Sequence, residues 1–427
     1  MYIRKIDIES IKSFKRFVWE LNDDDELEGW HVILGKNGAG KSSFIKSTAV
    51  ALSGPVEANK TRVSFGEWVS KGKDAGFIRV YIVPEAQLDK WGQSGRKGAK
   101  GIDGFQFSLK VEGNGALSAV NGGPDAKGSL WSGKPGWFSS SYGPYRRFSG
   151  GSSDYQKLFY SAPLVARHLS VFGEDVALTE SLEWFKELQF KKLENEKSNS
   201  AVLLEKIVEF INQDNLLPSG VKLDKISSDG VHFVDPYGNN VSIVELSDGY
   251  RSVLSLMIEL IRQMVMCYQS ENIFSDDNTT VTHPGVVFID EVDVHLHPSW
   301  QRQIGGWLTR HFPKVQFIVT THSPLICQSA SKGSVWLLPS HDGAVKGGRL
   351  KGEQYNKLVY GNILDALGSI AFGVDSSRSS EALEKMEKLA ALNAKEIFEG
   401  LSDAEVKERT ELQAIFPQVA FAMPEAI

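Results

Sequence analysis

The chain reads Gly35-Lys36-Asn37-Gly38-Ala39-Gly40-Lys41-Ser42 near its N-terminus, and this stretch decides the fold. It follows an apolar run, residues 30–34, and precedes a helix-like run, residues 44–50. The spacing G-x-x-x-x-G-K-[ST] between a strand and a helix predicts a P-loop, whose backbone N–H groups curl around a polyphosphate. In such a loop the lysine reaches the phosphates and the hydroxyl after it ligates Mg²⁺. The residues expected to hold phosphate are Gly35, Asn37, Gly38, Gly40, Lys41, Ser42 and Ser43, with Ser42 also on the metal.

The composition is that of a globular protein with room for several domains. The chain has 427 residues, of which 41% are hydrophobic and 23% charged, and its net charge is -6. Cys267 and Cys327 are its only cysteines, too few for a disulfide framework or a cysteine metal site, and this count fits a reducing cytosol. The N-terminus lacks a signal-peptide apolar region, and the longest apolar run, residues 254–268, contains Glu259 and Arg262. We therefore expect a cytoplasmic protein without a membrane span.

The secondary-structure signals divide the chain into four parts. Residues 1–160 are expected to form an N-terminal lobe with the P-loop and a β subdomain, with strands near 77–83 and 105–111. Residues 161–217 predict a helical insertion, an αα-hairpin joined near 195–200. Residues 218–345 predict a β meander, a long helix from about Ser247 and buried parallel strands at 285–290 and 315–320. Residues 346–427 predict a helical C-terminal region with a capping box at 402–405.

Four further motifs follow the P-loop in order. Residues 244–252 (VELSDGYRS) place Ser247 and Gly249 at the start of a long helix, where a hydroxyl and free N–H groups can meet an anion. Residues 286–291 are four apolar residues followed by Asp290, which can support Mg²⁺, and Glu291, which can polarise the attacking water. Residues 292–298 (VDVHLHP) come next, and the run 318–324 (IVTTHSP) ends a strand at His322.

This set of motifs resembles the ABC-type ATPases of the SMC, RecF and OLD kind over most of residues 1–340. The resemblance implies an α/β fold, an ABC-type P-loop head with a mixed sheet, helices and an antiparallel β subdomain, and it implies ATP and Mg²⁺ as ligands. It identifies 246–252 as the signature motif, Asp290 and Glu291 as Walker B, and His322 as the switch histidine. The family works as head-to-head dimers, so Ser247 and Gly249 would act on nucleotide held by Lys41 of a partner copy.

The chain departs from the family at two places. The family's D-loop usually has an aspartate where this chain has His297, and the lid glutamine is not obvious. We assign the lid to residues 141–147 (SYGPYRR), although Arg146 and Arg147 fit a solvated or interface pair better than a direct phosphate contact. His295 and His297 could suggest a metal site, but no carboxylate or cysteine pattern supports one, which leaves packing or an interface contact.

The size of the insertion narrows the type of ATPase. Residues 43–246 separate the P-loop from the signature, and only about forty of them look inserted and helical, which excludes long coiled-coil arms. No D-x-D pattern follows His322, so we expect no TOPRIM nuclease in this chain. It resembles the compact ATPases of anti-phage systems such as Septu and related retron modules, which pair with a separate effector nuclease.

The resulting hypothesis is an ATPase that controls such an effector by ATP-dependent dimerisation, or by forming a higher oligomer. A RecF-like DNA-binding ATPase of repair is the alternative, and a nucleotide sensor with negligible hydrolysis is a third reading. The lysines and arginine of residues 96–100 could bind nucleic acid or simply face water.

Overall fold

The computed structural model shows two compact units, Met1–Tyr360 and Gly361–Ile427. The structure describes residues 1–61, 63–91, 103–145, 158, 161–173, 179–213, 217, 220–227, 229–340, 346–362, 366 and 380–416. The basic loop at 96–100 and the pair Arg146 and Arg147 lie outside these residues. The four-part division expected from the sequence stays a prediction.

A six-stranded sheet forms the centre of the first unit, in the order β14-β13-β3-β12-β11-β7. All its neighbouring strands run parallel except the edge pair β13 and β14. The strands are β3 (Gly29–Leu34), β7 (Ser139–Tyr142), β11 (Gly285–Ile289), β12 (Val315–Thr321), β13 (Gly333–Leu337) and β14 (Gly348–Arg349). Every residue of β11 and β12 is buried, which confirms the two parallel strands predicted from their continuous apolar runs.

A second, antiparallel sheet of five strands has the order β2-β1-β4-β5-β6. Its strands are β1 (Tyr2–Ile11), β2 (Phe14–Glu20), β4 (Ala75–Val83), β5 (Phe105–Glu112) and β6 (Leu117–Asn121). In β4 the buried residues alternate with half-buried ones, so one face of this sheet points into the core. The antiparallel β subdomain that the sequence predicted is therefore present.

The buried side chain of Gln316 joins the two sheets. Its amide accepts from the backbone N–H of Ile3 at 2.7 Å and donates to the carbonyl of the same residue at 2.8 Å. Gln316 belongs to β12 and Ile3 to β1, so this pair of bonds fixes how the parallel strand lies against the antiparallel sheet.

Helix α1 (Lys41–Ala58) packs between these sheets, since it contacts β1, β4, β5, β6 and β7. At its far end the chain kinks at Gly54, whose φ is 80°, before Pro55. A proline lacks the N–H that would bond to the carbonyl four residues earlier, that of Ala51. The indole of Trp131 donates to this freed carbonyl at 3.0 Å, which explains how the kink is tolerated.

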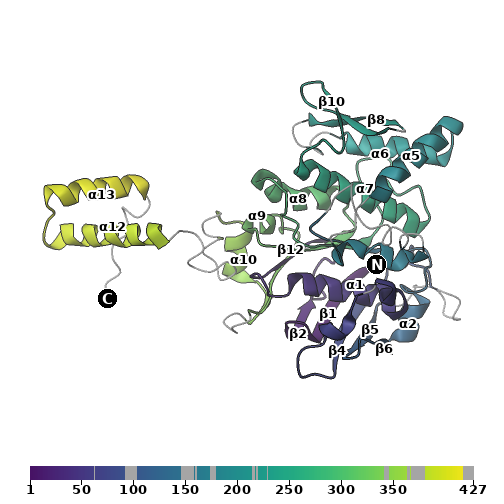
Figure 1. Ribbon diagram of the computed structural model, residues 1–427, viewed down its shortest axis with the longest axis horizontal. Helices are drawn as coiled ribbons and strands as arrows, with labels where there is room; N and C mark the ends of the chain where they lie inside the picture. The colour runs from purple at the N-terminus through teal and green to yellow at the C-terminus, as the bar shows by residue number, and fades with distance from the viewer. Residues whose placement is uncertain are drawn as a thin grey trace. The chain divides into compact units, whose positions relative to one another are not determined.

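The remaining elements of the first unit surround this core (Figure 1). The helical insertion is the hairpin α5 (Thr179–Glu194) and α6 (Asn199–Ile211), as predicted, and it packs on the meander β8 (Lys222–Ser227), β9 (Gly230–Val234) and β10 (Asn240–Ser242). The long helix is α7 (Asp248–Tyr268). Shorter helices are α2 (Gly123–Gly128), α4 (Pro163–Ala166), α8 (Pro298–His311), α9 (Pro324–Cys327) and α10 (Gly352–Val359), and 3-10 turns lie at Asn59–Thr61, Phe65–Trp68 and Leu169–Val171.

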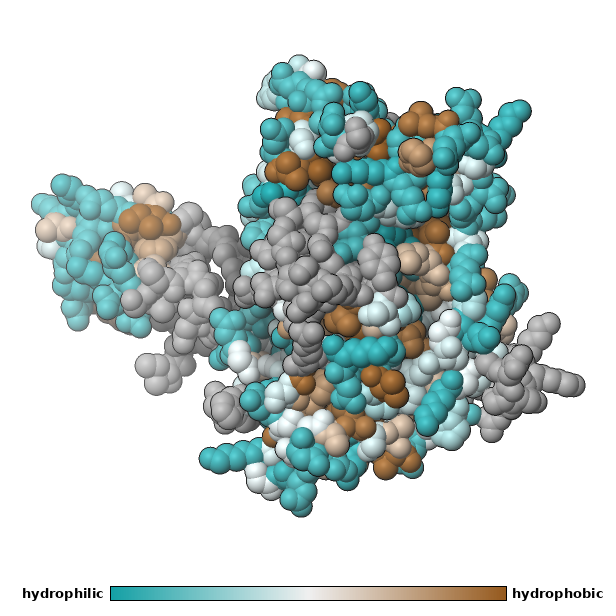
Figure 2. All heavy atoms as spheres, turned by 45° about the vertical axis from the view of Figure 1, so that its right-hand side comes forward, coloured by the Kyte–Doolittle hydropathy of each residue, from teal (hydrophilic) through white to brown (hydrophobic). Residues whose placement is uncertain are grey.

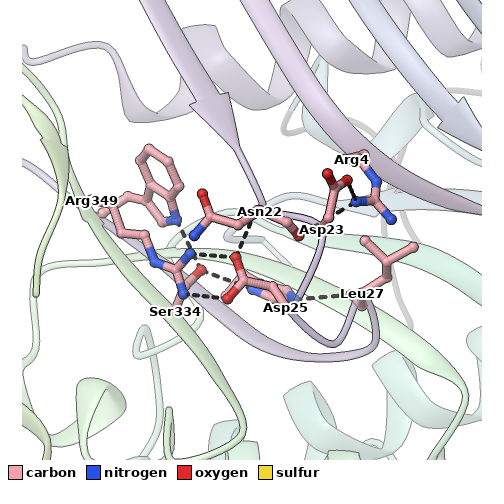
Figure 3. A network of polar contacts seen from close by, with 9 residues as sticks. Arg4, Asn22, Asp23, Asp25, Leu27, Ser334 and Arg349 are labelled. Carbon is pink, nitrogen blue, oxygen red and sulfur yellow. Dashed lines mark hydrogen bonds and ion pairs between the residues drawn. The ribbon is translucent and has the colours of Figure 1, made fainter.

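Polar contacts tie the edge strand β14 to the loop that enters β3 (Figure 3). Arg349 binds the carboxylate of Asp25 through two guanidinium nitrogens, one of them at 2.9 Å, and Asp25 also accepts from the N–H of Asn22 at 2.6 Å. The hydrogen bond from Arg349 holds the pKa of Asp25 below its usual value. Strand β14 has only two residues and therefore few backbone hydrogen bonds to β13. The bidentate ion pair between Arg349 and Asp25 helps to hold this strand at the edge of the sheet.

The second unit consists of the helices α12 (Ser380–Phe398) and α13 (Asp403–Ile415) in the described part of the chain. The predicted capping box is present, because Ser402 and Glu405 bond reciprocally at the start of α13. Among the described residues, no helix combines the length and the apolar character that a bilayer crossing requires.

Candidate nucleotide site

The P-loop has the conformation that its glycines permit. Strand β3 ends at Leu34, and α1 begins at Lys41. Gly38 and Gly40 have φ of 80° and 102°. At Gly40 a Cβ would lie 2.5 Å from the hydroxyl of Ser13 and 2.8 Å from the ring of Phe14, so space as well as conformation requires glycine. The loop therefore presents the N-terminus of α1 as an anion site.

The side chain of Lys41 is 5% exposed and is held by two acceptors. Its amine donates to the carbonyl of Gly35 at 3.0 Å and contacts Nε2 of His322. Burial lowers the pKa of Lys41, and the nearby carboxylates of Glu291, Asp290 and Asp293 oppose that shift. The structure thus brings the P-loop lysine, the Walker B carboxylates and the switch histidine into one electrostatic cluster, as the motifs predicted.

Thr320 organises the two Walker B carboxylates. Its hydroxyl donates to Oδ1 of Asp290 at 2.6 Å and accepts from the N–H of Glu291 at 2.8 Å. Asp290 is 2% exposed at the end of β11, and Glu291 adopts φ of 46°, a left-handed conformation that is uncommon for a non-glycine residue. Sequence reasoning missed Thr320, although its place two residues before His322 on the neighbouring parallel strand could have indicated it.

The loop after Glu291 is fixed by residues of the next strand and helix. Thr321 donates its hydroxyl to Asp293, and Gln301 donates to the carbonyl of Leu296 at 2.9 Å. His297, at the position where the family has an aspartate, is the N-cap of α8 and accepts from the N–H of Ser299 through Nδ1 at 3.3 Å. Within the described residues no cluster of three potential metal ligands occurs, and helix capping accounts for His297.

The signature residues Ser247 and Gly249 lie at the start of α7. Ser247 is the N-cap but makes no side-chain hydrogen bond to the helix, and it is exposed. A Cβ at Gly249 would lie 3.1 Å from the carbonyl of His295, so the helix tip packs against the loop that follows Walker B. No hydrogen bond between described residues joins Ser247 or Gly249 to the P-loop. The single chain thus assembles Lys41 with the switch histidine and Walker B but leaves the signature residues outside this cluster.

The predicted lid segment begins beside Walker B. Strand β7 pairs in parallel with β11, and the N–H of Asp290 donates to the carbonyl of Tyr142 at 2.8 Å. The carboxyl ends of both strands meet at one edge of the sheet, so residues 143–145 leave β7 next to Asp290. The lid assignment itself stays a prediction, since it includes Arg146 and Arg147.

A cavity of about 180 Å³ lies beside the P-loop. It is lined by Lys12, Ser42, Ser43, Lys46, Ser47, Val63 and Trp68. The hydroxyl of Ser47 is buried and has no hydrogen-bond partner among the described residues. Lys12 and Trp68 come from segments with no recognisable motif, so no sequence pattern places them here.

Comparisons with known proteins agree with this geometry. Residues 148–328, which include the signature, Walker B and His322, match the family model "AAA domain, putative AbiEii toxin, Type IV TA system". This part of the chain is thus similar to an AAA ATPase family, which agrees with the type of ATPase that the motifs resemble.

The relatives of this ATPase domain include the proteins expected from the resemblance. The chain is 34% identical over 162 residues to "Retron Ec83 probable ATPase" of Escherichia coli, covering 35% of this chain and 28% of that protein. It is 27% identical over 342 residues to "Septu protein PtuA" of Bacillus mycoides (strain KBAB4), covering 79% of this chain and 40% of that protein. The chain thus matches less than half the length of these relatives.

One solved structure similar to this ATPase domain is "Crystal structure of the SmcHead bound to the C-winged helix domain of ScpA". The identity is 18% and the TM-score 0.49, over 83% of this chain and 99% of that one.

Proposed function

We propose that this chain binds and hydrolyses ATP and acts as the regulatory subunit of an anti-phage defence complex. ATP-dependent head-to-head dimerisation would control a separate effector, a nuclease. Two observations carry the proposal. The side chain of Lys41 lies close to His322 and to the carboxylates of Asp290 and Glu291. Ser247 is exposed, and its hydroxyl makes no hydrogen bond to its own helix. A second copy can supply Ser247 and Gly249 to the nucleotide.

The side chains present suit a magnesium nucleotide. Ser42 and Asp290 offer the oxygen ligands that Mg²⁺ prefers. When bound, the metal would neutralise charge on the phosphates. Lys41 and the backbone N–H groups of the P-loop would bind the β- and γ-phosphates. The cavity lined by Ser47 and Trp68 has room for part of the nucleoside.

The chain's own groups can carry the hydrolysis. Glu291 would orient a water and take its proton as the water oxygen bonds to the γ-phosphorus and the bond to the β-phosphate oxygen breaks. The products are ADP and inorganic phosphate. His322 would contact the γ-phosphate after Lys41 moves from its ring nitrogen to the phosphates. Relatives that are named as a retron ATPase and as Septu proteins support the defence role.

The substitution Glu291→Gln tests the assignment. It keeps the shape of the side chain but removes the base, so turnover should fall about 10²-fold or more while ATP still binds. Size-exclusion chromatography with ATP and Mg²⁺ should then show a trapped dimer or larger oligomer. Unchanged turnover, or a monomer under all nucleotide conditions, would contradict the proposal.

Two other outcomes would favour the alternative functions. Stimulation of turnover by DNA, weakening steeply with salt, would favour a DNA-binding ATPase of repair. Tight ATP binding with negligible turnover in the unmodified chain would favour a nucleotide sensor.

A further inference from the structure

Two adjoining hollows lie at the end of α1 that is remote from the P-loop. The larger, of about 490 Å³, is lined by α1 residues 53–57, by residues 127 and 131–133 around α2, and by Pro163 and Leu164 of α4. The smaller, of about 170 Å³, shares Gly133, Pro163 and Leu164 with it and continues to α7. Figure 2 brings the right-hand side of Figure 1 forward and shows apolar and polar side chains intermixed on that side. Together the hollows form one groove, which we call the α1–α7 groove.

The α1–α7 groove has apolar walls and an exposed apolar rim. Trp131 and Leu164 are half-buried in its walls. Val56, on the rim, is 73% exposed, and Met266 at the other end is 50% exposed. Exposed apolar side chains along a hollow with apolar walls suit the binding of a protein segment, and methionine adapts its shape to a partner.

Four cations line the same groove. Arg262 is paired with the buried carboxylate of Glu259 at 2.7 Å. The other three are Lys127, Lys134 and Arg167, and within the described part of the chain no carboxylate lies at ion-pair distance from any of them. Arg167 donates one N–H to the sulfur of Cys267 at 2.7 Å, which leaves other guanidinium donors. Glu57, the carboxylate among the lining residues of the larger hollow, is paired with Lys60 at 2.6 Å. The groove therefore has an excess of positive charge although the chain as a whole carries -6.

The apolar wall and the three cations without a carboxylate partner among the described residues together match a peptide, which offers an apolar side chain and carboxylates in one segment.

We infer that the α1–α7 groove binds a segment of a separate protein in which a bulky apolar residue is flanked by aspartates or glutamates. The apolar side chain enters the hollow beside Trp131 and Leu164, and the carboxylates meet Lys127, Lys134 and Arg167. The inference deepens the proposed function by giving the chemistry of a partner, and it relies on that function only for the partner's identity.

A selection experiment tests the groove. A display library of random nine-residue peptides is panned on the full chain without nucleotide. The expected enriched sequences carry an aromatic or aliphatic residue with two or more carboxylates. A representative, synthesised and labelled, is then measured by fluorescence polarisation, together with its amide version in which every Asp and Glu is replaced by Asn and Gln.

Matched variants of the chain separate groove binding from general charge effects. Lys127→Glu with Lys134→Glu, both at exposed positions, should raise the Kd of the acidic peptide about tenfold, and Val56→Asp should also weaken it. The control, Lys71→Glu with Lys73→Glu in the exposed turn before β4, makes the same change in net charge and should leave the Kd unchanged.

Four results would overturn the inference. In the selection, these are peptides that are not enriched above an empty support, or enriched peptides without an excess of Asp and Glu. In the binding assay, these are a Kd of the amide version equal to that of the acidic peptide, or a rise in Kd for the control variant as large as for the groove variant. Binding is repeated with Lys41→Ala, which removes the proposed nucleotide contact and leaves the groove intact. If that variant still binds the peptide, peptide binding does not depend on the nucleotide site. Failure of the groove proposal and failure of the ATPase proposal can then be told apart.

Discussion

The amine of Lys41 contacts Nε2 of His322, although 281 positions separate the two residues in the sequence. A lysine ammonium can only donate, so Nε2 of the histidine accepts and its ring is neutral. Burial lowers the pKa of His322, and the neighbouring Lys41 lowers it further. The lysine that would bind phosphate is thus held by the histidine that would contact the same phosphate, and nucleotide has to displace this contact.

Replacing His322 should separate binding from turnover. In His322→Ala the P-loop and Lys41 remain, so ATP affinity should stay within about threefold, while turnover should fall about 10²-fold because a contact to the transferred phosphate is lost. Fluorescent-nucleotide titration and phosphate release measure the two quantities. The comparison variant Lys41→Ala should lose both, and equal losses of affinity in the two variants would contradict the separate roles.

Thr320→Val should raise the Mg²⁺ concentration that turnover requires. The valine has the shape of threonine but cannot donate to Asp290 or accept from the N–H of Glu291. Loss of such an orienting partner typically costs 10–100-fold, so the Mg²⁺ concentration for half-maximal turnover should rise by about that factor. Thr309→Val removes a hydroxyl bonded only within α8 and should change nothing. An unchanged Mg²⁺ titration in Thr320→Val would show that Asp290 needs no such support.

Buried His168 predicts that the protein loses stability in mild acid. Its ring contacts the hydroxyls of Ser141 at 2.6 Å and Ser139 at 3.2 Å, and burial lowers its pKa from 6.5 to about 3. The unfolded chain therefore binds a proton here below pH 6.5 that the folded chain does not bind until about pH 3. The free energy of unfolding should fall with falling pH in this window, by up to about 1.4 kcal/mol per pH unit from this group.

Urea unfolding of His168→Gln between pH 7 and 5 tests whether His168 causes this loss of stability. The variant should be less stable at pH 7 but should lose less stability per pH unit than the unmodified chain. If the slopes of the two proteins agree, another group controls the acid sensitivity.

The kink in α1 predicts a large cost for one methyl group. In Gly54→Ala the residue must keep φ of 80°, and its Cβ would lie 2.9 Å from three atoms of the Trp131 indole. Gly72→Ala provides the matched control, because Gly72 has φ of 79° but no atom within 4 Å of the added Cβ. We expect about 1–2 kcal/mol of destabilisation at Gly72 and about 1–3 kcal/mol more at Gly54. Equal free energies of unfolding for the two variants would mean that the indole simply moves aside.

Local patterns were sufficient to predict much of this molecule. The P-loop spacing, the apolar runs of β11 and β12, and the helical periodicity of α5 and α6 each depend on residues close together in the chain. Lys12 and Trp68 could not be assigned in this way. Each joins the site only because distant segments pack together, and no local spacing records that.

By itself the sequence determined the type of fold and the chemical groups of a P-loop nucleotide site, because backbone conformation and binary patterning act over a few residues. Tertiary structure decided which groups meet. It placed His322 on Lys41, made His297 a helix cap and brought Lys127, Lys134 and Arg167 to one apolar groove. The physical reason is that strand order in the sheet and the packing of α1 between two sheets bring distant residues together, and these depend on the whole core.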